Sequence, residues 1–343
     1  MKRLRKASLT GVMALTLLAG LAGCSRQTAA TTSSNGTGTK TTANHSNEVY
    51  YWVSQNSTLP LFVQNDYKGL ALAAKQLGVT VKKAGPTNIN LPGFISTIEQ
   101  VCAMHPAGVT VVGWDPSETA AVNQCIAEGV PTVTDDADLP DSKRLAFIGT
   151  NWYNIGAAQA KAMLQATGGH GQVAVLSIIN ADNMKQAVQG FKDTLKGTGL
   201  QIVASEDDGG DASKAAQQTA SLLAAYPHLA GIAGMDSESG AGIVQALKEA
   251  NKVGQVKVTA MEQTPAFFKT VQDGSVSAII VQKRELFTYY AIKFLYDYNH
   301  NGLTVDGLKP PIASTIPQNI DTGLLVVTKD NVNQLLAADK SNS

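Results

Sequence analysis

Cysteine and histidine are scarce in this chain of 343 residues, which contains three cysteines and five histidines. No pair of cysteines has the Cys-x-x-Cys spacing, and the histidines are scattered along the chain without the spacing of zinc ligands. We therefore expect no metal site. No other motif in the sequence indicates a cofactor, so we expect none.

Long hydrophobic runs are also rare, and the most prominent one lies at the N-terminus. The chain starts with the cationic stretch Met-Lys-Arg-Leu-Arg-Lys and continues with an apolar run over residues 9–20, which is too short to span a bilayer. This combination is typical of a secretory signal peptide. We predict that residues 1–23 form this signal and are removed on export.

The signal ends in Leu21-Ala22-Gly23-Cys24, which resembles the lipobox of bacterial lipoproteins. The resemblance implies cleavage before Cys24 and acylation of its thiol. A lipid anchor would then hold the mature chain at the outer face of the cell membrane, or in the periplasm of a cell with two membranes. An ordinary signal peptide with an incidental cysteine is the alternative.

Neither sign of charge dominates, because 27 basic residues face 27 acidic ones. Removal of the signal takes away four basic residues and no acidic ones, which leaves 23 basic residues and a net charge of −4. Nucleic-acid-binding domains carry a basic excess. We therefore expect no nucleic-acid partner.

Residues 24–47 consist mostly of Ser, Thr, Ala, Asn and Gly, a composition that buries little apolar surface and predicts a flexible tether. Folded structure should begin near Glu48. The remaining stretch of about 295 residues exceeds the usual domain size of roughly 100–200 residues. We therefore predict two lobes.

Strand-like and helix-like segments alternate along the rest of the chain. Residues 48–54 are rich in strand-forming side chains, and residues 108–113 are a continuous apolar run, as in a strand buried on both faces. Residues 65–77 and 92–104 repeat apolar positions with helical spacing. The alternation starts again after residue 150, so we predict two α/β lobes, each a doubly wound parallel sheet.

Polar residues follow the predicted strands in both lobes, and they are the first candidates for a binding site. They are Gln55-Asn56-Ser57, Trp114-Asp115, Asp135-Asp136, Asp236-Ser237-Glu238 and Glu262-Gln263. In an open α/β sheet, ligands bind at the carboxyl ends of the strands. Two such edges that face each other would enclose a polar solute.

From residue 49 to residue 327, the order and spacing of these segments resemble the ribose- and galactose-type solute-binding proteins of ABC importers. The resemblance implies the periplasmic-binding-protein type I fold, in which a hinge of three crossings joins two lobes. It places the first lobe at residues 48–149 plus 283–313 and the second at residues 150–282 plus 314–330. The third crossing is expected at Ile312–Thr315.

The resemblance also assigns ligand contacts in the first lobe. Phe62 occupies the position of an aromatic residue that stacks on a sugar ring, whereas Leu61 stands where the ribose receptor has a second one. Asp135 is followed by Asp136 in place of the family's arginine, so we expect recognition that relies on carboxylates more than on arginine. A solvated turn is the alternative for this pair.

Several further candidates have an equally simple structural interpretation. Asn151 and Trp152 match the first crossing, where Trp152 either lines the cleft or packs on the hinge. Lys185 either donates to a ring hydroxyl or lies on the surface, and Asp211 either contacts ligand or caps the helix that follows. The remaining predicted contacts are Asp115, Asp236, Glu262 and Gln282.

Cys102 and Cys125 lie near the C-terminal ends of two predicted helices. A strand order of 2-1-3-4-5 with right-handed crossovers puts both helices on the same face of the first sheet. A disulfide and two buried free thiols are both compatible with this arrangement.

These features together predict a monomeric receptor that captures a neutral sugar or polyol and delivers it to an ABC-type permease. A signalling receptor for a furanosyl autoinducer or a chemotactic sugar is the alternative on the same fold. A repressor of the lactose-repressor type would carry a helix-turn-helix, and a glycosidase would need two acids that flank the scissile bond. The sequence shows neither feature, so we expect no enzymatic activity.

Overall fold

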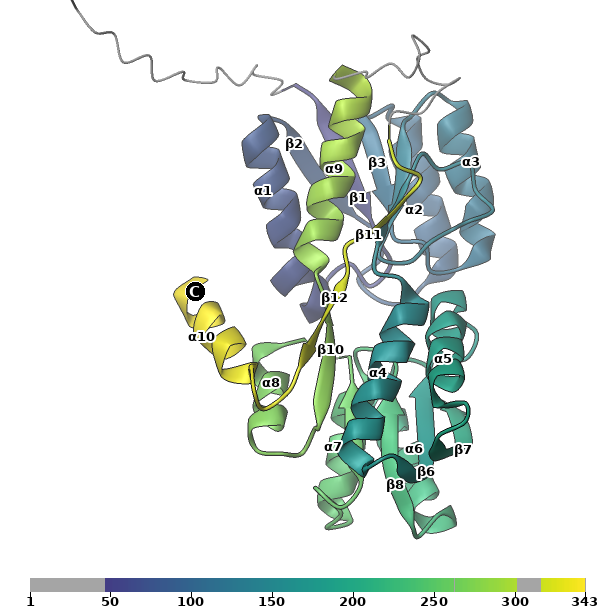
Figure 1. The fold of residues 1–343 in the computed structure, drawn as a ribbon. Helices are drawn as coiled ribbons and strands as arrows, with labels where there is room; N and C mark the ends of the chain where they lie inside the picture. The colour runs from purple at the N-terminus through teal and green to yellow at the C-terminus, as the bar shows by residue number, and fades with distance from the viewer. Residues whose placement is uncertain (1–46, 262, 301–315, 343) are drawn as a thin grey trace, which may run out of the picture. The chain divides into compact units, whose positions relative to one another are not determined.

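The computed structural model describes residues 47–261, 263–300 and 316–342 of the chain. In this part, two six-stranded sheets carry helices on both faces (Figure 1). The predicted fold class, two doubly wound α/β lobes, is confirmed. We call the two sheets with their helices the first and the second lobe.

The first sheet has the strand order 2-1-3-4-5 predicted for its first five members, with one more strand at the edge. Its strands lie in the order β11 (Asn319–Asp321), β5 (Phe147–Gly149), β4 (Thr132–Asp135), β3 (Gly108–Val111), β1 (Val49–Val53) and β2 (Thr80–Ala84), and all neighbours are parallel. The sequence analysis did not predict β11, because a strand of three residues is too short to show an alternating hydrophobic pattern.

Helices cover both faces of the first sheet. They are η1 (Phe62–Asp66), α1 (Tyr67–Leu77), α2 (Leu91–Ala103), η2 (Pro116–Glu118), α3 (Thr119–Ala127) and α9 (Arg284–His300). Trp52 of β1 and Ile292 of α9 belong to the buried cluster on one face, and Val53 of β1 and Val122 of α3 belong to that on the other. Adjacent residues of β1 thus serve opposite faces, as the pleat of a strand requires.

The second sheet repeats this arrangement with one difference. Its strands lie in the order β12 (Leu324–Val327), β10 (Ala278–Gln282), β9 (Lys257–Ala260), β8 (Leu229–Gly234), β6 (His170–Ser177) and β7 (Gly199–Asp207). β12 runs antiparallel to β10, while the other neighbours are parallel. The sheet is therefore mixed, not wholly parallel as predicted.

The helices of the second lobe pack closely enough for backbone contact. They are α4 (Trp152–Thr167), α5 (Asp182–Leu195), α6 (Ala212–Ala225), α7 (Ser239–Glu249), α8 (Pro265–Gln272) and α10 (Val332–Asn342). A Cβ atom at Gly156 of α4 would meet the carbonyl of Ala187, and one at Gly190 of α5 would meet the carbonyl of Tyr153. Glycine at both positions therefore lets α4 and α5 cross in contact.

Three connections join the two sheets: β5 to α4, β10 to α9, and β11 to β12. The first and third lie side by side. The amide of Thr322 donates to the carbonyl of Gly149 at 2.8 Å, and the amide of Asn151 donates to Oδ1 of Asp321 at 3.2 Å. These bonds link the first and third connections to each other.

The third connection lies later in the chain than predicted. We expected it at Ile312–Thr315, which falls outside the described residues, and we assigned residues 314–330 to the second lobe. Instead, Asn319–Asp321 pair with β5 of the first sheet, so the chain crosses after Asp321.

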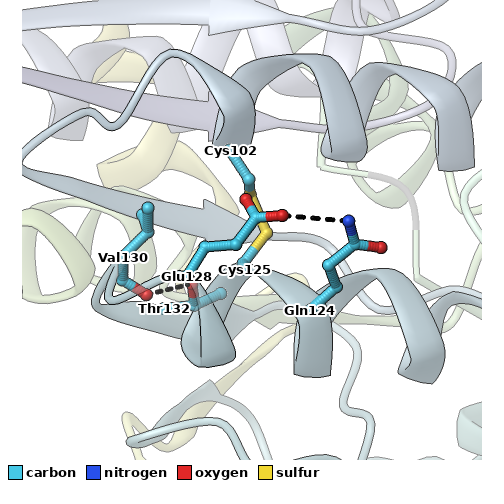
Figure 2. The surroundings of a disulfide bond; sticks show 6 residues. All are labelled: Cys102, Gln124, Cys125, Glu128, Val130 and Thr132. Carbon is cyan, nitrogen blue, oxygen red and sulfur yellow. Dashed lines mark hydrogen bonds between the residues drawn. A yellow bond between two sulfur atoms is a disulfide. The ribbon is translucent and has the colours of Figure 1, made fainter.

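Cys102 of α2 and Cys125 of α3 form a disulfide, with their Cα atoms 5.2 Å apart (Figure 2). Both residues are buried in the cluster beneath the two helices, on the same face of the first sheet. Of the two alternatives left by the sequence, the structure has the disulfide. A cross-link over a separation of 23 residues typically stabilises a fold by about 2–4 kcal/mol.

The helices described here are too short or too polar to cross a membrane.

Candidate functional site

A cavity of about 330 Å³ opens where the strands of both sheets end. The first lobe lines it with Gln55, Asn56, Leu59, Leu61, Phe62, Ile89, Leu91, Trp114, Asp115 and Asp136. The second lobe and the connections line it with Trp152, Ile178, Asn180, Ala181, Met184, Gly209, Gly210, Asp236, Ser237, Glu238, Met261, Gln282 and Arg284. Its volume lies in the usual range for small-molecule sites, about 300–1,000 Å³.

Arg284, at the start of α9, forms the charged centre of the cavity wall. Its guanidinium donates to Asp66 at 2.7 and 3.0 Å, to Asp136 at 2.7 and 2.9 Å, and to Oε1 of Gln282 at 2.9 Å. A guanidinium has five N–H donors, so these five bonds use all of them. Arg284 therefore fixes the groups around it and has no N–H left over for a ligand.

The two carboxylates on Arg284 come from distant parts of the first lobe. Asp66 ends η1, and Asp136 follows β4; both are buried. Burial raises the pKa of Asp66 to about 7, although the charge of Arg284 lowers it. Burial alone would lower the pKa of Arg284, but Asp136 and Asp66 raise it, so the guanidinium stays charged.

Asp136 also has an unusual backbone. Its φ of 63° is in the left-handed region that few non-glycine residues adopt. Two contacts hold it there: the paired bonds of its side chain with Arg284, and the bond that Nε1 of Trp152 donates to its carbonyl at 3.0 Å. Trp152 thus lines the cavity and also links the second lobe to the first.

Aromatic rings form one wall of the cavity. The ring of Phe62 is fully buried, edge-on to Trp52 at 5.3 Å between centroids, and 5.2 Å from Cζ of Arg284. Trp114 lies 6.3 Å from Phe62 and donates from Nε1 to the hydroxyl of Ser54 at 3.3 Å. These contacts fix both rings in place at the cavity.

Two amide side chains present polar atoms to the cavity that have no protein partner. Nε2 of Gln282 and Oε1 of Gln55 are buried and make no hydrogen bond to any residue that the structure describes. Unsatisfied buried polar atoms cost about 1–3 kcal/mol each. One donor from the second lobe and one acceptor from the first are therefore available to a ligand.

At the second lobe, two buried carboxyl groups contact one hydroxyl. Oγ of Ser239 lies 2.5 Å from Oδ2 of Asp208 and 2.7 Å from Oδ2 of Asp236. A hydroxyl has one proton to donate, so two ionised carboxylates cannot both accept from it. The amides of Glu238 and Ser239 both donate to Oδ1 of Asp236, each at 2.9 Å.

Asp208 is the carboxyl group of this pair whose pKa is raised, so it is the one that can hold the proton. It is fully buried beneath the cavity wall. Burial, followed by the charge of Asp236, raises the pKa of Asp208 to about 7. Its proton can bridge to Oγ of Ser239, which resolves the conflict.

Six of the predicted site residues line the cavity, and four do not. Those that line it are Phe62, Asp115, Asp136, Trp152, Asp236 and Gln282. Glu262 lies outside the described residues.

The four others have structural roles. Asp135 lies behind the cavity, where it accepts from Thr110 at 2.6 Å and from Nε1 of Trp52 at 3.2 Å. Asn151 and Asp211 cap α4 and α6 by accepting from backbone amides at 3.1 and 2.8 Å. Lys185 is exposed and pairs with Asp182 at 2.6 Å, while Met184 beside it lines the cavity.

Arg284 and Asp66 were not predicted as site residues, whereas Gln55 belongs to one of the strand-end segments expected to contribute to a binding site. The expectation that carboxylates would replace the family's arginine was incomplete, because Arg284 brings a guanidinium to Asp136 from 148 residues away. The only local sign of the role of Arg284 was its position two residues after Gln282, and the segment there resembled the start of an ordinary helix.

A larger depression of about 790 Å³ lies along α4, β10 and β12 of the second lobe. It is lined by one lobe only, with alanine and lysine as its commonest residues, and the carboxyl ends of the parallel strands do not open into it. We therefore regard the smaller cavity as the functional site.

The chain is similar to known proteins in its family, in its sequence and in its structure. The family described as periplasmic binding protein domain matches residues 50–302. A D-ribose/D-allose-binding protein of Pseudomonas aeruginosa is 26% identical over 173 residues, which cover 50% of this chain and 50% of that protein. The chain thus spans about half the length of this curated relative.

Two solved structures resemble nearly the whole folded part. A sugar-binding protein of a sugar ABC transporter from Bacillus halodurans is 29% identical with a TM-score of 0.77, covering 84% of this chain and 99% of that chain. The arabinose-binding protein AraP from Geobacillus stearothermophilus is 29% identical with a TM-score of 0.75, covering 84% and 98%.

The Arg284 network leads to a prediction about stability. Arg284→Met leaves Asp66 and Asp136 buried without their partner, and removing one member of a buried ion network typically costs about 3–5 kcal/mol. We expect the free energy of unfolding in urea to fall by this amount. Lys185→Met, which removes an exposed pair, is the matched control and should change it by less than about 0.5 kcal/mol.

A triple variant separates lost charge pairing from lost packing. Arg284→Met combined with Asp66→Asn and Asp136→Asn leaves no uncompensated charge, so it should recover part of the lost stability. Equal losses for Arg284→Met and Lys185→Met would contradict the assigned role.

The pair of carboxyl groups on Ser239 leads to a prediction about pH. Because the folded pKa of Asp208 is raised to about 7, from about 4 in the unfolded chain, the folded state binds more protons between these values. The contribution of Asp208 to the free energy of unfolding is fully present below pH 4 and is lost as the pH rises through 7. Asp208→Asn should therefore weaken the decline in melting temperature between pH 5 and 8.

Asp207→Asn is the control for this measurement. The pKa of Asp207 is lowered by its bond with Lys214, so its contribution is lost only at acidic pH, below the range tested. Parallel curves for the wild type and Asp208→Asn would show that Asp208 holds no proton.

Proposed function

Because the chain belongs to the periplasmic binding protein family, we propose that it captures a neutral monosaccharide or polyol in the cavity between the strand ends of its two lobes. One observation carries the proposal. Nε2 of Gln282 and Oε1 of Gln55 are buried at the cavity, have no hydrogen-bond partner and come from opposite lobes. A hydroxyl both donates and accepts, so a polyhydroxyl ligand can satisfy the two amides together.

The aromatic rings support the same ligand class. Phe62, Trp114 and Trp152 present carbon surface beside these amides. A sugar ring has apolar C–H faces and a polar hydroxyl edge, so it matches a site that combines aromatic carbon with a few placed polar groups.

The charges at the cavity disfavour anions. Among the lining residues that the structure describes, four are acidic, Asp115, Asp136, Asp236 and Glu238, and one, Arg284, is basic. All five N–H groups of Arg284 are already used by Asp66, Asp136 and Gln282. A phosphate or carboxylate would meet a negative surface with no free guanidinium donor.

The similar proteins point in the same direction. By their names, the relative from Pseudomonas aeruginosa binds D-ribose or D-allose and the protein from Geobacillus stearothermophilus binds arabinose. All three ligands are neutral monosaccharides.

The acids at the cavity support binding more than catalysis. Asp136 is held by Arg284, and Asp236 accepts from two amides and from Ser239. Neither is placed as a free general acid opposite a second free carboxylate, as glycoside hydrolysis requires. We therefore propose a receptor that acts as a monomer and passes its sugar to an ABC-type permease.

The lipobox-like Leu21-Ala22-Gly23-Cys24 supports a second element of the proposal. Acylated Cys24 would anchor the receptor outside the cell membrane, and the residues up to 47 would act as a tether. The folded part would then reach the permease without a spanning helix of its own.

Sugar binding is tested by calorimetric titration with D-ribose, D-allose, D-arabinose, D-glucose, D-galactose and sorbitol, against glutamate and phosphate as other ligand classes. We expect at least one neutral compound to bind and the anions to fail. Gln282→Met and Gln55→Met should each weaken binding about tenfold, because one hydrogen bond in a buried site is lost.

Gln272→Met is the matched control, because Gln272 is exposed on α8 and does not line the cavity. It should leave affinity unchanged. Binding of anions alone, or unchanged affinity in both cavity variants, would refute the proposed ligand class or site.

Lipid attachment is tested by expressing the full chain and Cys24→Ser in a bacterium supplied with radioactive palmitate. The wild type should incorporate label and enter the detergent phase on Triton X-114 partition, and Cys24→Ser should do neither. An unlabelled, water-soluble wild type would contradict the anchor.

A further inference from the structure

The cavity is divided by residue type, and the division follows the order of the strands. Its charged residues follow β3, β4, β8 and β10: Asp115, Asp136, Asp236, Glu238 and Arg284. Among the described lining residues, the segments after β1, β2, β6 and β7 contribute no charge. Their polar side chains at the cavity are the amides Gln55, Asn56 and Asn180, and they contribute carbon from Leu61, Ile89, Leu91, Ile178 and Met184.

The strand order separates these two groups in space. β1 and β2 end the first sheet on the side away from β5 and β11, and β6 and β7 end the second sheet on the side away from β10 and β12. The connections between the lobes leave from the opposite side, where Gln282 and Arg284 lie. The cavity therefore runs from a polar end near the connections to an apolar end at the free edges of both sheets.

On this basis we infer that the ligand is a sugar with an apolar group, either a deoxygenated carbon of the sugar or an alkyl or aryl aglycone. This inference rests on the proposed sugar-binding function and specifies its substrate class. The hydroxyls occupy the polar end, beside Gln282 and Asp236. The apolar group lies between the segments after β2 and β6, against Ile89, Leu91, Ile178 and Met184.

Helix α5 shows how the apolar end arises. One of the two roles predicted for Lys185 was to donate to a sugar hydroxyl, but its side chain is exposed and pairs with Asp182. Met184 lines the cavity instead, with 3% of its surface exposed. Met184 packs in the same buried cluster as Trp152 and Met261. A flexible, polarizable thioether adapts to carbon groups of different shape and offers almost no hydrogen bonding to a hydroxyl.

Across from it, the segment after β2 presents Ile89 with 66% of its surface exposed. A ligand that covers so exposed an apolar side chain at the mouth of a cavity removes apolar surface from water, which favours its binding. A ligand with hydroxyls on every carbon would leave Ile89 and Met184 against polar groups.

The experiment compares matched sugars by calorimetric titration of the mature chain. The pairs are D-galactose with 6-deoxy-D-galactose, D-glucose with 6-deoxy-D-glucose, and D-allose with 6-deoxy-D-allose; methyl and phenyl β-D-galactosides test the aglycone. We expect at least one deoxygenated or substituted compound to bind about tenfold tighter than its parent, the effect of one carbon group in an apolar pocket.

Two exposed apolar residues provide matched variants. Ile89→Asn should weaken the apolar-substituted compound more than the parent sugar, so that the preference falls to near unity. Leu72→Asn on α1, also exposed and absent from the cavity lining, should leave both affinities unchanged. If these residues served only to close the lobes on each other, Ile89→Asn would weaken both compounds equally, which would overturn the inference.

The outcomes separate this inference from the function on which it rests. Tighter binding of a 6-deoxy sugar supports a deoxygenated ligand, and tighter binding of a galactoside supports an aglycone. Parents that bind as tightly as, or more tightly than, all their derivatives overturn the inference and leave sugar capture intact. Failure of every sugar and glycoside refutes sugar capture itself.

Discussion

The buried guanidinium of Arg284 holds together the parts of the chain that meet at the cavity. It joins Asp66 at the end of η1, Asp136 after β4 and Gln282 at the end of β10, and five hydrogen bonds leave none of its donors free. A buried charge of this kind is tolerated only with its partners in place. The position of the Gln282 amide, and with it the polar end of the cavity, follows from this network.

The rest of the site is arranged around that fixed end. Phe62 is packed between Trp52 and Arg284, and Trp152 ties the second lobe to the backbone of Asp136. The unpaired amide atoms of Gln282 and Gln55 then mark where we propose that a ligand supplies hydrogen bonds, and Ile89 and Met184 mark where we infer that it supplies carbon. A single rigid centre thus sets both the polarity and the direction of the cavity.

Much of the fold could be predicted from the sequence, because strand and helix patterns are local and the strand order followed from the resemblance to a known family. The site was only partly predictable. Asp136 and Asp236 line the cavity at strand ends, but Asp211, the same residue type after another strand, caps a helix. On α5, Met184 reaches the cavity and the neighbouring Lys185 does not. Asp136, one of the two carboxylate partners of Arg284, lies 148 residues away from it. No local sequence pattern reveals either arrangement.

The most direct test of the account is a crystal structure of the mature chain with the sugar that binds most tightly. The account predicts the sugar in the cavity at the strand ends, with hydroxyls within hydrogen-bond distance of Nε2 of Gln282 and Oε1 of Gln55 and a carbon face against Phe62 or Trp114. A sugar bound instead in the depression along α4 and β12, or one that leaves both amides unpaired, would contradict it.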